Sequence, residues 1–111
     1  MTDADRKYLF DILTAIDLIG SFTKSTGSFQ DYLLDIKTRS AVERQLGIIG
    51  EAVNKYDLLN QAFTLVNARK IVGFRNRLIH AYDAIDQSII WAIIINHLPL
   101  LKKEVEHKLG K

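Results

Sequence analysis

The chain has 111 residues, of which 48% are hydrophobic, and it carries 15 Lys and Arg against 13 Asp and Glu, a formal net charge of +2. This length and composition favour one domain across residues 1–111 with enough apolar side chains for a core, and they exclude a wholly disordered chain. Because the sequence contains no cysteine, disulfides, a zinc–thiolate site and a cysteine nucleophile are excluded.

The first half of the chain predicts three helices. Thr2 opens a capping box for a helix with one apolar face, which ends in the Ser-, Thr- and Lys-rich stretch 20–27. Ser28 repeats this signal for a short helix through Leu34. A longer helix with a near-heptad apolar pattern follows over residues 37–58.

Two glycines, Gly47 and Gly50, lie inside this longer helix. Glycine in a helix interior costs about 1 kcal/mol relative to alanine. We therefore expect another helix to approach closely here, including one from a second copy of the chain.

The second half predicts the remaining helices. Asn67 is the expected N-cap of a fourth helix that extends to about Ile79, and residues 83–86 begin the next one. The apolar run 89–95 has no strand to pair with, so we expect a helix that is buried on nearly all sides and is kinked or restarted at Pro99. The chain thus predicts an all-α, up-and-down bundle of four or five helices.

No segment is suited to secretion or to a membrane. The N-terminus opens with acidic residues, and no cleavage site follows an apolar run. The longest unbroken apolar run, 89–95, is far shorter than the ~20 residues that a membrane span needs. We therefore expect a cytoplasmic protein with no membrane partner.

The positive charge of the chain lies in one segment. Residues 58–82 contain no Asp or Glu, and once the four cations of this segment are set aside, 11 Lys and Arg remain against 13 Asp and Glu. A basic segment beside acidic surroundings is typical of an anion-binding site, although a solvated helix face gives the same pattern. The four cations are Arg69, Lys70, Arg75 and Arg77.

The familiar signatures of metal, phosphate-loop and serine chemistry are missing from the sequence. His80, His97 and His107 form no HxxxH pair and have no carboxylate at the spacing of metal ligands. A Gly-rich phosphate loop and a Gly-x-Ser-x-Gly elbow are also missing. We therefore expect no metal site and no cofactor.

Arg75 occupies an unusual position in the fourth predicted helix. On a helical projection it lies in the middle of the apolar face, and Tyr82 returns to nearly the same angle. Because burying an unpaired charge is costly, Arg75 must meet an acid, a second subunit or a bound anion. Glu51 is the most obvious partner within the chain, and a purely structural Arg75–Glu51 pair with a packed Tyr82 is one interpretation.

His80 does not share this helical face. It lies about 140° around a continuous helix from Arg75, so one unbroken helix cannot direct both side chains at one phosphate. Either the helix breaks between the two residues, or a symmetry-related chain in a dimer completes the site. Both alternatives favour an interface at this segment.

The segment RNRLIHAY, which contains Arg75, His80 and Tyr82, resembles the R-x4-H-x-Y signature of HEPN-domain ribonucleases. It is most similar to that of the HepT-like toxins of HepT/MntA toxin–antitoxin systems. Residues 41–52 and the Tyr-Asp-x-Ile-Asp stretch after the motif extend the resemblance over nearly the whole chain. The resemblance implies a HEPN-type helical bundle that acts as a homodimer, with the motifs of both chains facing a shared cleft.

The resemblance also implies a role for each motif residue. Arg75 and His80 match the catalytic positions of metal-independent endoribonucleases, and Asn76 matches the polar residue that often follows the arginine. Tyr82 matches the residue to which a partner minimal nucleotidyltransferase, the MntA-like antitoxin, attaches AMP. The flanking phosphates of an RNA substrate would then contact Arg69, Lys70 and Arg77.

Two other classes of function remain open. The same bundle could serve as a non-catalytic nucleotide- or substrate-binding subunit of a minimal nucleotidyltransferase, or as a plain helical interaction protein. The presence of Arg75, Asn76 and His80 together favours the ribonuclease, because a pure binding module needs no titrating group at His80.

Overall fold

Every regular element that the structure describes is helical, as the sequence predicts. The computed structural model describes the backbone of residues 1–80 and 85–111, and the side chains of 1–77 and 85–111. No helix in this part of the chain has the length and apolar character that crossing a membrane requires. The elements are α1 (Asp3–Phe22), α2 (Phe29–Leu34), α3 (Ile36–Leu59), the 3-10 turn η1 (Val66–Ala68), α4 (Arg69–His80), α5 (Gln87–Ala92), the π-helical turn η3 (Ile93–His97) and α6 (Leu98–Lys108).

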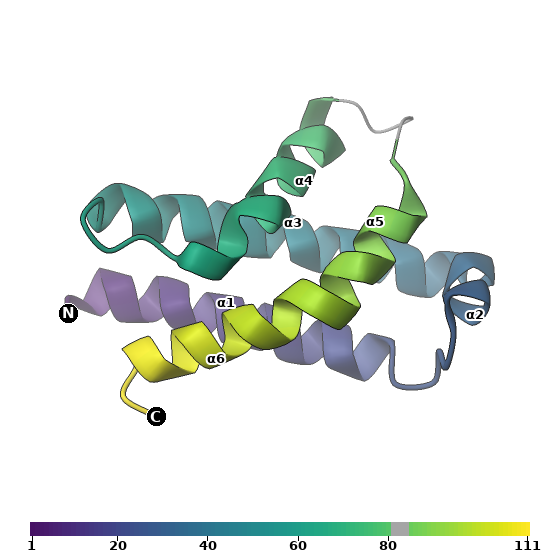
Figure 1. Ribbon diagram of the computed structural model, residues 1–111, viewed down its shortest axis with the longest axis horizontal. Coiled ribbons are helices and arrows are strands. Elements are labelled where there is room, and N and C mark those ends of the chain that lie inside the picture. The colour runs from purple at the N-terminus through teal and green to yellow at the C-terminus, as the bar shows by residue number, and fades with distance from the viewer. Residues whose placement is uncertain (81–84) are drawn as a thin grey trace.

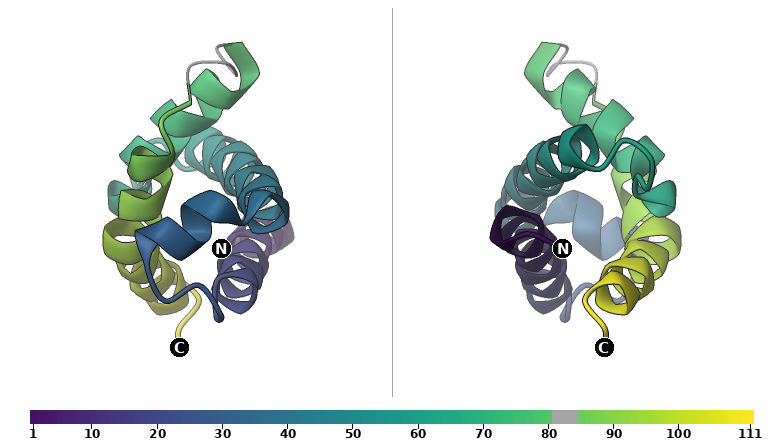
Figure 2. Two further views of the ribbon diagram at one scale, coloured as in Figure 1. Left: turned by 90° about the vertical axis from the view of Figure 1, so that its right-hand side faces the viewer. Right: turned by 90° about the vertical axis from the view of Figure 1, so that its left-hand side faces the viewer.

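The helices form an up-and-down bundle around one apolar core (Figures 1 and 2). The two longest helices, α1 and α3, run antiparallel side by side. The consecutive helices α5, η3 and α6 form one rod, which packs against α1 and lies across the core from α3. The short helix α2 crosses one end of the bundle, and α4 crosses α3 and extends beyond it. Fully buried core side chains come from every long helix and include Leu9, Ile12, Leu46, Ile49, Ile71 and Leu101.

The predicted starts of the first two helices are confirmed by their capping hydrogen bonds. The Thr2 hydroxyl accepts the Asp5 N–H at 3.1 Å, and the Asp5 carboxylate accepts the Thr2 N–H at 3.2 Å. The Ser28 hydroxyl accepts the Asp31 N–H at 3.2 Å in the same way. Asp5 also accepts from Asn60 Nδ2 at 2.9 Å, and these hydrogen bonds, that of Asn60 first, hold the pKa of Asp5 below its ordinary value. The start of α1 is thereby joined to the end of α3.

The predicted N-cap of the fourth helix is wrong. Asn67 lies inside η1, and α4 begins two residues later at Arg69. The cap is the carboxylate of Glu104 on α6, which accepts the N–H groups of Val66 at 2.7 Å and Asn67 at 2.9 Å, and the Asn67 side-chain amide at 3.0 Å. A carboxylate near free N–H groups at a helix start is favourable, and here it comes from a distant part of the chain.

The apolar run 89–95 is helical, as expected, but its burial is incomplete. Ile90 and Ile93 are fully buried, whereas Ile95 is 54% exposed, so the expectation of burial on nearly all sides is wrong. The helix restarts at Pro99, as expected: the π-helical turn η3 ends at His97, and α6 begins at Leu98 with Pro99 in its first turn. Proline lacks an N–H and its ring crowds the carbonyl four residues earlier, and the wider π-helical turn relieves both problems.

Candidate active site

The structure places Arg75 where α4 crosses α3, directly over Gly50. A Cβ atom added to Gly50 would lie 2.7 Å from Arg75 Cβ and 2.9 Å from its Cδ. No side chain fits in this space, so glycine is what allows the two helices to approach. The predicted close approach of another helix is confirmed for Gly50 and comes from α4 of the same chain.

Arg75 forms an ion pair with Glu51, the residue after this glycine. Its Nη2 donates a hydrogen bond to Glu51 Oε2, which confirms the partner expected from the sequence. The other carboxylate oxygen, Oε1, lies 3.6 Å from Lys55 Nζ. The Arg75 side chain is 23% exposed and that of Glu51 is 47% exposed. Glu51 therefore neutralises the charge of Arg75, and solvent still reaches both side chains.

This arrangement leaves Arg75 able to bind a second anion. A guanidinium has five N–H donors in a planar fork, and Glu51 accepts from Nη2. A phosphate can therefore bind beside the carboxylate without breaking the ion pair. The planar fork of N–H donors suits Arg75 to stabilise charge that develops on a phosphate.

The helix that carries the motif is continuous. α4 runs unbroken from Arg69 to His80, so the alternative in which the helix breaks between Arg75 and His80 is wrong. Positions 75 and 80 therefore lie about 140° apart around one helix. The remaining alternative is a site completed by a second chain. The side chain of His80 and the whole of Tyr82 lie outside the described residues.

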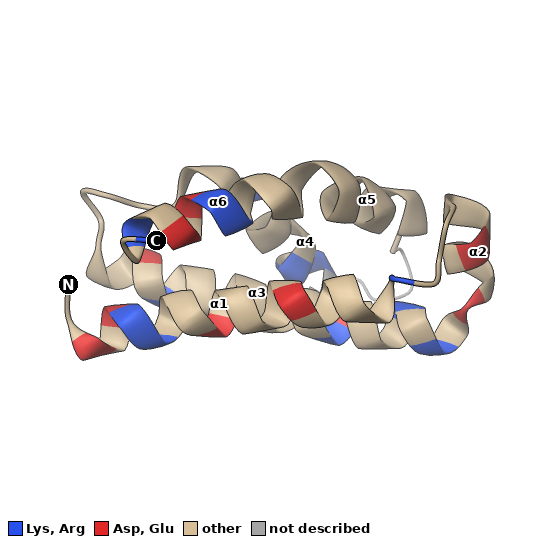
Figure 3. Cartoon of the chain, turned by 90° about the horizontal axis from the view of Figure 1, so that it is seen from below, with Lys and Arg blue, Asp and Glu red and all other residues tan. Residues whose placement is uncertain are grey.

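The other predicted site residues of α4 are separated from Arg75. Arg69, Lys70, Asn76 and Arg77 are exposed, and helical geometry directs them away from the face that meets α3. Lys70 and Arg77 border a hollow of about 350 Å³ together with residues of α4 and α5. The predicted RNA contacts thus lie on the exposed side of α4, away from the Arg75–Glu51 pair. The described part of α4 contains no Asp or Glu, and Figure 3 accordingly shows blue but no red on this helix.

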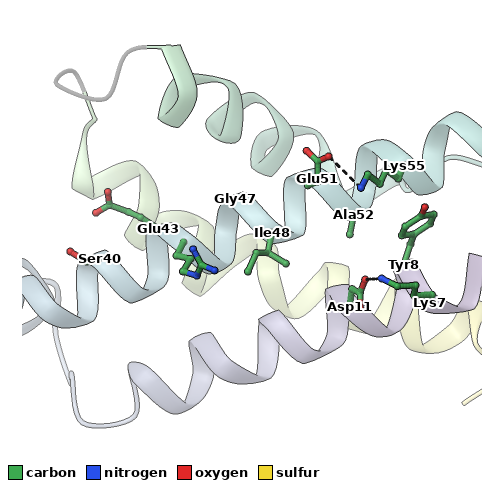
Figure 4. Close-up of a pocket in the computed structure, with 11 residues that line it drawn as sticks. Lys7, Tyr8, Asp11, Ser40, Glu43, Gly47, Ile48, Glu51, Ala52 and Lys55 are labelled. Atoms are coloured by element: carbon green, nitrogen blue, oxygen red, sulfur yellow. Dashed lines mark hydrogen bonds and ion pairs between the residues drawn. The ribbon is translucent and has the colours of Figure 1, made fainter. Parts of the chain in front are cut away.

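A groove of about 550 Å³ lies between α1 and α3 and was not expected from the sequence (Figure 4). Glu51 belongs to its lining, so the Arg75 ion pair borders this groove. The sequence does contain a pattern for this face of α3, because the α3 residues that line the groove recur at three- and four-residue spacing from Ser40 to Lys55. The charged residues of the lining are Lys7, Asp11, Glu43, Arg44, Glu51 and Lys55.

No group of three or more His, Asp or Glu side chains that could hold a metal ion occurs among the residues described by the structure.

The Gly50→Ala variant tests the contact that positions Arg75. The added methyl group meets the Cβ of Arg75 and not the flexible end of a side chain, so α3 and α4 must move apart. We expect the free energy of unfolding to fall by about 1–3 kcal/mol, as for other overpacked contacts. Urea denaturation measures this loss. Gly20→Ala in α1 is the control, because nothing lies within 4 Å of its added Cβ, and equal stability of the two variants would contradict the crossing.

Comparison with known proteins gives one consistent result. Residues 12–107 match the family described as Ribonuclease HepT-like. The "Probable ribonuclease HepT" of Thermococcus cleftensis is 37% identical over 107 residues, which cover 96% of this chain and 96% of that protein. A candidate RNase of Methanocaldococcus jannaschii, MJ0127, is 40% identical over 103 residues, which cover 91% of this chain and 84% of that protein. No solved structure matches the chain significantly.

Proposed function

The chain belongs to the HepT-like ribonuclease family, and from this membership we propose that it is a cytoplasmic, metal-independent endoribonuclease toxin that acts as a homodimer. Arg75 and His80 are the catalytic residues, and Asn76 orients the phosphate or the histidine. A minimal nucleotidyltransferase of the MntA type is the antitoxin, and it attaches AMP to Tyr82.

The position of Arg75 is the observation that supports this proposal most directly. A cation is held at a helix crossing by one carboxylate, with one side open to solvent. A purely structural ion pair needs no further basic residues around it, yet α4 also presents Arg69, Lys70 and Arg77 on its exposed face. Such a surface suits a polyanion with several phosphates, and RNA binding through it should weaken as salt concentration rises.

The chemistry requires only the groups of the motif. The 2′-oxygen of RNA forms a bond to the adjacent phosphorus while the bond from phosphorus to the 5′-oxygen breaks. Histidine accepts the proton of the 2′-hydroxyl and, as the imidazolium, gives it to the departing 5′-oxygen, so that a 2′,3′-cyclic phosphate and a 5′-hydroxyl remain. His80 suits this proton transfer because its ordinary pKa is about 6.5, and Arg75 stabilises the negative charge on phosphorus.

The decisive experiment is RNA cleavage by the purified wild-type protein in excess EDTA, beside the Arg75→Ala and His80→Ala variants. We expect the wild type to cleave RNA without a divalent metal and to leave cyclic phosphate ends. If the wild type cleaves no better than His80→Ala, the protein is not a ribonuclease that uses His80, and the alternative of a non-catalytic binding subunit of the nucleotidyltransferase is favoured.

The proposed modification of Tyr82 is tested by mass spectrometry of the protein after co-expression with its nucleotidyltransferase. AMP on Tyr82 would add a bulky anion two residues from His80 and would compete with the substrate for Arg75, so we expect the modified protein to lose RNA cleavage. The Tyr82→Phe variant is the control and should remain active in the presence of the partner. Modification at another residue, or at none, contradicts the assignment.

A further inference from the structure

Gly47 leaves the backbone of α3 open to approach from outside the chain. Gly50 is required by the contact with Arg75, but a Cβ atom added to Gly47 would meet nothing within 4 Å. Gly47 lies in the floor of the groove between α1 and α3, where its neighbour Ile48 is 38% exposed (Figure 4). Because Gly47 has no side chain and nothing packs over it, another helix can approach the backbone of α3 closely here.

The residues that α3 contributes to the groove have an internal symmetry. Arg44 and Glu51 lie at equal distances on either side of the midpoint between Gly47 and Ile48, as do Ser40 and Lys55. With about 100° per residue, Arg44 and Glu51 both fall within about 10° of the centre line of this face. We call this set, Ser40, Arg44, Gly47, Ile48, Glu51 and Lys55, the α3 stripe.

We propose that the α3 stripe is the surface through which two copies of the chain pair, with their α3 helices antiparallel around a two-fold axis at the midpoint between Gly47 and Ile48. Arg44 of each copy then faces Glu51 of the other, and Ile48 of each copy packs over Gly47 of the other. A two-fold interface requires a self-complementary surface, and the α3 stripe meets this requirement. The inference rests on the homodimer of the proposed function and gives it a contact surface.

The charges of the groove favour a second copy over RNA. The lining carries Lys7, Arg44 and Lys55 against Asp11, Glu43 and Glu51, which is a balanced set. RNA binding depends on a local excess of positive charge, and the groove has none. A groove that carries both signs, with Arg44 and Glu51 placed symmetrically about its centre, is instead complementary to an inverted copy of itself.

This interface connects the second copy to the site. Glu51 holds Arg75 in its own chain, so Arg44 of the other copy binds the same carboxylate that positions the catalytic arginine. Arg44 thereby becomes a positioning residue supplied in trans. Since Glu51 lies three to four residues from the axis, the two Arg75–Glu51 pairs lie about 10 Å apart along the helices, which places both on one surface of the dimer.

Charge reversal tests the interface without any RNA. We expect light scattering to show a dimer for the wild type and a monomer for Arg44→Glu, because the introduced carboxylate would face Glu51 of the other copy. Lys103→Glu makes the same charge change on an exposed part of α6 and should leave the dimer intact. A monomeric wild type or a dimeric Arg44→Glu variant overturns the interface.

Cysteine cross-linking tests the same contact with a variant that keeps all charges. The chain has no cysteine, so Ile48→Cys introduces a single thiol beside the proposed axis. A short bis-maleimide should link two such chains, whereas Val66→Cys, which replaces a 75% exposed residue at η1, should not be linked. Equal cross-linking of the two variants overturns the interface. Neither experiment measures cleavage, so the two proposals can fail separately. A dimer that pairs through the α3 stripe but does not cleave RNA would contradict only the proposed function. A protein that cleaves RNA without this interface would contradict only the inference.

Discussion

Replacing Arg75 with alanine should lower kcat for RNA cleavage by about 10²- to 10³-fold, the loss found when one donor to a developing oxyanion is removed. Arg75 is the cation that the structure holds at the α3–α4 crossing, and its ion pair with Glu51 fixes the direction of its fork. Removing it leaves a phosphate in the site without the charge that stabilises the transition state. Single-turnover cleavage of a defined RNA measures this effect.

Arg75→Lys separates charge from geometry. Lysine keeps the positive charge but has no planar fork, so it cannot hold Glu51 and a phosphate oxygen in the same fixed arrangement. We expect this variant to stay well below the wild type in kcat and to recover only part of the activity lost in Arg75→Ala. Full recovery would show that only the charge is needed.

Arg77→Ala is the matched control on the same helix. Arg77 is exposed and lies on the far side of α4 from Glu51, in the face proposed to bind flanking phosphates. We expect its loss to raise KM and to reduce the salt dependence of binding, with kcat little changed. If Arg77→Ala lowered kcat as much as Arg75→Ala, the assignment of Arg75 as the catalytic arginine would be wrong.

The parts of the fold that sequence predicts well are those that nearby residues determine. The caps at Thr2 and Ser28 use N–H groups only three residues away, so local spacing is sufficient to find them. The pairing of Arg75 with Glu51 was also predictable, because a charge on an apolar face requires a compensating group. Gly50 added an independent signal, since an interior glycine indicates close approach.

The parts that sequence predicts poorly depend on the three-dimensional arrangement of distant segments. Glu104 caps the region of Asn67 from 37 residues away, and Asn67 itself is a good cap by its residue type, so the local signal led to the wrong residue. The exposure of Ile95 has the same origin, because composition gives the apolar character of 89–95 but not the number of helices that pack around it. The groove between α1 and α3 also required the packing of two helices to be known.

Replacing His80 with alanine should lower the rate of cleavage by about 10²- to 10⁴-fold, the usual contribution of a positioned general acid or base. The pH profile is the more specific measurement. The wild-type rate should depend on pH through the protonation of His80, and this dependence should disappear in His80→Ala. His97→Ala and His107→Ala are the controls, because these residues lie in η3 and α6, outside the motif helix. A similar loss in either control would contradict a special role for His80.

The continuity of α4 makes a mixing experiment decisive for how Arg75 and His80 cooperate. If each site combines Arg75 of one chain with His80 of the other, a dimer of one Arg75→Ala chain and one His80→Ala chain has one intact site and one doubly damaged site. Random exchange of equal amounts of the two inactive variants then recovers about a quarter of the wild-type activity, because half of the dimers are mixed and each has one working site. If both residues act within one chain, every site lacks one residue and mixing recovers nothing. Recovery would therefore explain why an unbroken helix can place two catalytic residues about 140° apart: each residue serves a different site.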